Sequence, residues 1–143
     1  MNRLALTCLL FFLAIGSHKG LAAEMYVVVN APANASLDED SLRALLTGKR
    51  RNWDDGNAAT AVLPSRESDD FEPVAGGLFD ASGRVMQRLW FRVVFSGRAN
   101  APIYVDDPSE VLLTVQAHQG ALGILVAEEM PKVPSSLRVV ELK

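Results

Sequence analysis

Apolar residues recur every three or four positions between Ser82 and Gly97, which is the clearest periodic pattern in the chain. The residues with this spacing are Val85, Met86, Leu89, Trp90, Val93 and Val94. On a helix they form one wide apolar face, because about 3.6 residues complete a turn. Asp80 or Ser82 can cap the first turn with a side-chain oxygen, and Gly97 suits the left-handed residue that ends helices. We predict an amphipathic helix whose apolar face needs a broad apolar cover.

Continuous apolar runs predict strands elsewhere in the chain. The runs at 25–30 and 121–127 have no polar alternation, which indicates strands buried on both faces. Shorter strands are expected at 61–63, 103–105 and 137–142. These strands supply the apolar cover that the helix needs.

Three further helices are predicted between the strands. One follows the capping box 36–39, in which Ser36 is the cap, and a second covers 71–79. The third begins at Asp107-Pro108, where a capping residue precedes proline at the first helical position. This order of elements predicts an α/β fold, a three-layer sandwich with a mostly parallel central sheet.

The first 22 residues have the pattern of a secretory signal peptide. Arg3 precedes an apolar run over 4–15, and Ala22 and Ala23 are small residues suited to cleavage. The run has 12 residues, whereas a membrane span needs roughly 20. We therefore expect removal of residues 1–22, one domain over 23–143, a periplasmic location and no membrane insertion afterwards.

Removal of the leader changes the composition of the remaining chain. Cys8 is the only cysteine and lies in the leader, so the domain has neither disulfide nor thiolate chemistry. Loss of Arg3 and Lys19 reduces the 14 basic residues to 12, against 17 acidic ones, which gives a net charge of −5. This balance argues against nucleic-acid binding.

Catalytic and metal chemistry are not expected. His118 is the only histidine of the domain and lies where a helix is predicted to end, a place where histidine commonly satisfies a terminal carbonyl. The aspartate pairs at 54–55, 69–70 and 106–107 lack the spacing of a calcium loop and are typical of turns and caps. We expect no enzyme activity, no metal site and no cofactor.

Two basic stretches are candidates for contact with a partner. The loop 49–56 fits an ordinary helix C-terminus followed by an Asp-Gly turn, or a partner site anchored by Trp53. Arg84, Arg88 and Arg92 follow one another at four-residue steps along the predicted helix. They fit a solvated helix face or contact with an acidic protein.

Several segments in one order resemble phosphate ABC transporter substrate-binding proteins, and more closely their short, single-lobe relatives among secreted bacterial proteins. The segments are Val27–Asn30, Leu46–Lys49, Trp53–Asp55, Leu89–Gly97 and Gly120–Ile124. The resemblance covers nearly all of the expected domain. It implies one lobe of a type II periplasmic binding protein, and binding of phosphate or another oxyanion as a solute-binding component of ABC-type transport.

The resemblance also implies where an anion would bind. In these proteins a turn at a helix N-terminus presents hydroxyls and amides to the anion, and the matching residues here are Ser65, Arg66 and Ser68, with Asn30 as a further contributor. However, Asp69 and Asp70 place negative charge in the same loop.

Two hypotheses of different classes therefore stand. The first is an exported oxyanion-binding protein. The second is a periplasmic accessory module that kept the fold, lost the ligand, and binds an envelope protein or a second copy of itself.

The leader gives a direct test. When the full-length chain is expressed in a bacterial host and purified from the periplasm, we expect the protein to begin near Ala23, because small residues there suit the signal peptidase. Intact mass and N-terminal sequencing measure this. A purified chain that retains residues 1–22 would contradict the prediction.

Overall fold

The computed structural model describes residues 23–143, and the predicted leader lies outside the described residues. Within this range the chain forms five strands and four helices. In chain order they are β1 (Glu24–Val29), α1 (Glu39–Leu46), β2 (Thr60–Pro64), α2 (Phe71–Phe79), α3 (Gly83–Phe95), β3 (Ile103–Val105), α4 (Pro108–Ala117), β4 (Ala121–Ala127) and β5 (Arg138–Leu142). No helix in this part of the chain is both long and apolar enough to cross a membrane.

The strands form one sheet in the order β3-β2-β4-β1-β5. Strand β2 pairs in parallel with β3 and β4, whereas β1 pairs antiparallel with both β4 and β5. Among the five strands, four therefore point in one direction and β1 points in the other. The predicted α/β class with a mostly parallel sheet is confirmed, and the reversal of β1 is a feature that the sequence pattern did not predict.

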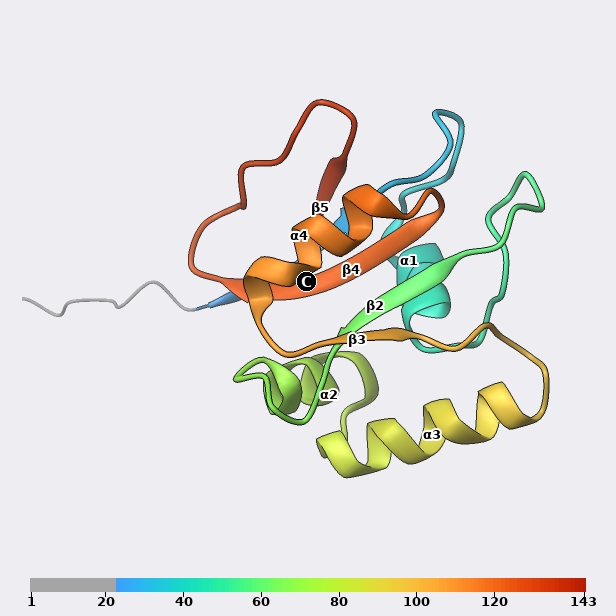
Figure 1. The fold of residues 1–143 in the computed structure, drawn as a ribbon, viewed down its shortest axis with the longest axis vertical. Helices are drawn as coiled ribbons and strands as arrows, with labels where there is room; N and C mark the ends of the chain where they lie inside the picture. The colour runs from blue at the N-terminus through green and yellow to red at the C-terminus, as the bar shows by residue number, and fades with distance from the viewer. Residues whose placement is uncertain (1–22) are drawn as a thin grey trace, which may run out of the picture.

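Helices cover both faces of the sheet, so the fold is the expected three-layer sandwich (Figure 1). Helices α1, α2 and α3 contribute Leu46, Val74 and Trp90 to the apolar cluster on one face. Helix α4 contributes Val111 and Val115 to the cluster on the other face. In Figure 1, α4 lies in front of the sheet and α1 behind it. Both faces of the central strands are thus removed from water.

Helix α3 is the helix that the periodic pattern predicts, and a tryptophan anchors it. Trp90 is 2 % exposed, and its indole N–H donates to the Leu46 carbonyl at 3.2 Å. This bond ties the middle of α3 to the end of α1 and satisfies a buried polar group. The opposite side of α3 is left to solvent.

Helix α1 begins later than its capping box indicates. The cap is Asp38 rather than Ser36, because the Asp38 carboxylate accepts from the Ser41 amide at 2.8 Å. The Ser36 hydroxyl instead donates to Asp38, and together with the bonds from Ser41 it lowers the pKa of this carboxyl to about 2. An ionised carboxylate is a stronger acceptor for a free helix amide than a hydroxyl is.

Close packing of α4 on β4 requires a glycine at position 123. A Cβ there would lie 2.6 Å from Val111 Cγ1 and 2.8 Å from Val115 Cγ2, both of which are fixed in the core. By contrast, a Cβ at Gly76 in α2 would meet nothing within 4 Å.

The two glycines predict opposite effects of the same substitution. Gly123→Ala overpacks the interface of α4 with the sheet and should lower the free energy of unfolding by about 1–3 kcal/mol. Gly76→Ala should raise it by about 0.5–1 kcal/mol, because glycine inside a helix loses more backbone entropy on folding. Denaturant unfolding of both variants measures this. Equal stability of the two variants would contradict the packing described for β4 and α4.

Candidate functional site

The loop between β2 and α2 holds three of the residues expected to bind an anion, and its serines are engaged within the fold. The Ser65 hydroxyl donates to the Asp106 carboxylate and accepts from the Glu67 amide at 3.2 Å. Ser68 is 7 % exposed, and its hydroxyl accepts from the Asp70 amide at 3.2 Å. An incoming anion would have to displace the bond to Asp106 to reach the Ser65 hydroxyl. The Ser68 hydroxyl accepts its bond and keeps its own proton for donation, but its side chain is almost fully buried.

Carboxylates also surround this loop. The Asp70 carboxylate accepts from the Val126 amide at 3.2 Å, which fastens the start of α2 to β4. Burial raises the pKa of Asp70 above its usual range, and the nearby Asp69 and Asp107 carboxylates raise it further. At about 4 Å and an effective dielectric near 20, one carboxylate repels a unit negative charge by about 4 kcal/mol. The C-terminal ends of β2 and β3 therefore disfavour the binding of phosphate.

Asn30 and this loop lie at opposite ends of the strands. This corrects the expectation that Asn30 joins Ser65 and Ser68 in one site. Because β1 runs antiparallel to β4, its carboxyl end meets the amino end of β4. There the Asn30 amide donates to the Val115 carbonyl at 3.0 Å and to the His118 carbonyl at 3.2 Å. Asn30 thus satisfies free carbonyls at the end of α4.

Trp53 is a core residue, so the expectation of an exposed aromatic anchor is wrong. Its side chain is 3 % exposed, and its indole N–H donates to the Gly120 carbonyl at 2.9 Å. The apolar ring is buried against the sheet because the turn after it brings the chain back, with the Trp53 amide donating to the Asn57 carbonyl at 2.8 Å. The ring is not available to a partner.

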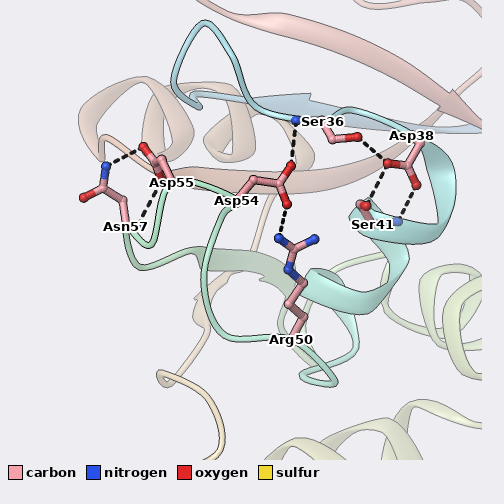
Figure 2. A network of polar contacts seen from close by, with 7 residues as sticks. All are labelled: Ser36, Asp38, Ser41, Arg50, Asp54, Asp55 and Asn57. Carbon is pink, nitrogen blue, oxygen red and sulfur yellow. Dashed lines mark hydrogen bonds and ion pairs between the residues drawn. The ribbon is translucent and has the colours of Figure 1, made fainter.

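Polar contacts hold the rest of this loop in place (Figure 2). The Asp54 carboxylate accepts from the Ser36 amide at 3.3 Å and forms an ion pair with Arg50. Asp55 closes the following turn by accepting from the Asn57 amide at 2.9 Å. Figure 2 shows these contacts, of which the bond from Ser36 to Asp54 joins the loop to the segment that precedes α1. The loop 49–56 is therefore built by its own contacts, as the ordinary reading of its sequence indicates.

Four arginines from two segments line one open concavity of about 910 Å³. Arg66 comes from the loop between β2 and α2, and Arg84, Arg88 and Arg92 come from the exposed side of α3. We call these four residues the arginine face. The structure thus joins a residue expected to bind an anion with the three expected to contact a partner.

The arginine face has little internal compensation of its charge. Within residues 23–143, none of the four guanidinium groups forms an ion pair, since the two pairs in this range are Arg43–Glu39 and Arg50–Asp54. Glu72 also lines the concavity, but its carboxylate accepts from the Gly83 amide at 3.0 Å, at the start of α3. Guanidinium groups present several N–H donors in a planar array, which suits carboxylate and phosphate oxygens.

The basic surface continues past the C-terminal end of α3. Arg92 also lines a concavity of about 420 Å³ together with Lys49 and Arg98. Lys49 and Arg98 in turn line a third concavity, of about 660 Å³, with Arg50 and Arg51. Eight of the 12 basic residues of the domain thus lie on one continuous surface.

Two aromatic residues beside the arginine face were not identified in the sequence. Phe91 is 65 % exposed and Phe95 is 75 % exposed, on the turns of α3 that follow Arg88. The signal was present, because positions 84, 88, 91 and 95 share one side of a helix. The apolar pattern on the other side of the same helix is longer and obscures this shorter one in the sequence.

The described residues show no constellation for metal binding. Among residues 23–143, no three histidine, cysteine, aspartate or glutamate side chains are grouped so as to hold a metal ion. The His118 Nδ1 atom lies 2.8 Å from the Thr114 carbonyl, a contact that closes the end of α4. The chemistry of the arginine face suits anionic groups.

Comparisons with known proteins give no family match: neither a scan against family models nor a search of curated proteins finds one. Two solved structures align with the chain. PstS from Borrelia burgdorferi has a TM-score of 0.49 and 13% identity over 73% of this chain and 41% of that protein. An ABC-type phosphate transport receptor from Vibrio cholerae has a TM-score of 0.47 and 18% identity over 84% and 46%. The chain spans less than half the length of either structure.

The raised pKa of Asp70 predicts a pH-dependent effect of one substitution. A carboxyl group whose native pKa lies above its unfolded value of 3.8 stabilises the fold most below that value, and this contribution is lost as the pH rises through the native pKa. Asp70→Asn cannot ionise, so it does not lose this stability as the pH rises, and its side chain keeps an oxygen that accepts from the Val126 amide. Its free energy of unfolding relative to the native chain should therefore rise between pH 3 and pH 7.

Denaturant unfolding across this pH range measures the effect. Glu128→Gln is the control, because it removes the same charge from an exposed position at the end of β4. Parallel pH curves for the two variants would contradict a raised pKa at Asp70.

Proposed function

We propose that this chain is an exported, non-enzymatic binding domain that recognises anionic groups of a partner molecule through the arginine face. The export rests on the leader sequence, and the binding rests on the site geometry. The supporting observation is the concavity of about 910 Å³ lined by Arg66, Arg84, Arg88 and Arg92. The domain acts as an accessory module of the cell envelope and performs no reaction itself.

The electrostatics of the domain support this role. The whole domain has a net charge of −5, yet eight basic residues form one continuous surface. Like charges brought together repel one another, and an anionic partner relieves this repulsion. A surface that served only for solubility would gain nothing from such clustering.

A phosphate-carrying role in ABC-type transport is the alternative that the sequence resemblance suggests. At the loop between β2 and α2 this role is opposed by the bond of the Ser65 hydroxyl to Asp106, by the burial of Ser68 and by the adjacent carboxylates. The arginine face accepts small oxyanions by the same chemistry as carboxylates. Phosphate and sulfate therefore belong among the ligands tested.

Neutralising part of the arginine face should weaken binding of a polyanion. Arg88→Gln/Arg92→Gln is expected to weaken binding of poly-L-glutamate roughly tenfold, because two exposed ion pairs contribute about 0.2–1 kcal/mol each and their loss is accompanied by a weaker overall field. Titration calorimetry of protein purified from the periplasm measures this at low and at physiological salt.

The matched control is Lys132→Gln/Lys143→Gln, which removes the same charge from exposed positions outside the basic surface. Equal weakening by both double variants would contradict the proposal. A saturable thermal shift with phosphate or sulfate that survives Arg88→Gln/Arg92→Gln but is lost in Ser68→Ala would instead support the solute-binding role. A ligand at about 100 times its Kd adds about 2.7 kcal/mol to the free energy of unfolding, and a thermal melt readily detects a change of this size.

A further inference from the structure

The exposed side of α3 carries a pair of phenylalanines whose rings are in contact and inclined at 36° to each other. The rings of Phe91 and Phe95 lie with their centroids 4.2 Å apart, one helical turn from each other. Their exposed fractions, 65 % and 75 %, place most of both rings in water. Single exposed apolar side chains are common on protein surfaces, but adjacent aromatic rings beside a groove are typical of binding sites.

A groove runs beside this pair, between α3 and β3. It has a volume of about 430 Å³, and its walls include Trp90, Phe91, Val94, Phe95, Pro102 and Tyr104. We call it the aromatic groove. The sheet ends at β3, so in the described part of the chain no further strand covers this side. Apolar walls of this kind hold an apolar side chain from a partner.

The aromatic groove and the arginine face lie on the two sides of the same exposed helix surface. Phe91 and Gln87 line both concavities. Helix α3 has 13 residues and is therefore about 20 Å long. A single ligand that crosses α3 at Phe91 contacts guanidinium groups on one side and aromatic rings on the other.

The chemistry of this combined surface favours one class of occupant. A second copy of the chain, docked by the same surface, would gather the arginines of both copies in one interface, since an isologous contact uses the same patch on both subunits. Nucleic acid is disfavoured by the net charge of −5 on the domain, and a planar bilayer does not follow two concavities. A polypeptide supplies both carboxylates and apolar side chains on one flexible chain.

We propose that the partner of this domain is a protein segment that combines acidic residues with an apolar anchor. The anchor occupies the aromatic groove, and the flanking carboxylates bind Arg88 and Arg92. This inference rests on the proposed function and adds the identity of the partner class. The charges set the approach and orientation of the segment, whereas the apolar side chain supplies specificity against other anions.

The test uses two fluorescein-labelled peptides of twelve residues, each with ten glutamates and two central residues, which are leucines in one peptide and serines in the other. Binding to the protein purified from the periplasm is followed by fluorescence anisotropy. We expect the leucine peptide to bind at least tenfold more tightly. Phe91→Ser/Phe95→Ser should remove this preference. Phe95→Ser alone, at a position that lines the aromatic groove and not the arginine face, should reduce the preference while leaving the affinity for the serine peptide within about twofold of the native value.

Leu113→Ser is the control variant, because Leu113 is 67 % exposed on α4, which packs on the other face of the sheet. It should leave both affinities unchanged, and thermal melting should show that all variants remain folded. Equal affinity of the native protein for the two peptides, with binding still weakened by Arg88→Gln/Arg92→Gln, would overturn this inference and leave the proposed function standing. Binding of neither peptide would overturn both.

Two further measurements separate the other occupants. Sedimentation with vesicles of phosphatidylglycerol tests a lipid surface, and light scattering of the purified protein tests self-association. Vesicle binding that Phe91→Ser/Phe95→Ser abolishes, in the absence of a leucine preference, would assign the surface to a membrane instead. A dimer that the same variant dissociates would assign it to a second copy.

Discussion

Strand β1 lies between β4 and β5 and runs against both, and the layout of the domain depends on this placement. Its valines at 27, 28 and 29 are fully buried, with alternate side chains in the clusters on the two faces of the sheet. The antiparallel direction carries Asn30 to the C-terminal end of α4, where its amide satisfies free carbonyls. It also separates Asn30 from the loop between β2 and α2. Asn30 and the residues of that loop therefore do not form one site.

The distribution of charge divides the surface into two regions. Acidic side chains gather where β2 and β3 end, as the contacts among Ser65, Asp106 and Glu110 and the raised pKa of Asp70 indicate. Basic side chains gather along α3 and beyond its end. The net charge of the domain conceals this separation, because it sums the two regions. Recognition depends on the local field, which for exposed groups extends only about one Debye length, roughly 8 Å at physiological salt.

The candidate site shows how far residue types alone can indicate function. The arginine stripe at 84, 88 and 92 was visible because it repeats with the helical period. Its association with Arg66 was not visible, since the two segments meet only when α2 and α3 fold back along the sheet. Trp53 illustrates the opposite error: a tryptophan in a basic, turn-rich loop suggested an exposed anchor, yet its indole N–H bonds to Gly120, which is 67 residues away.

The sequence by itself determined the type and order of the helices and strands, because helical and strand periodicity, capping residues and proline are local signals. It also determined the three-layer α/β class, since strands apolar on both faces require helices on both sides. The tertiary structure alone decided the direction of β1, the burial of Trp53 and the meeting of Arg66 with α3. These features depend on contacts between residues that are distant along the chain, and no local pattern of apolar and polar positions encodes which of those contacts form.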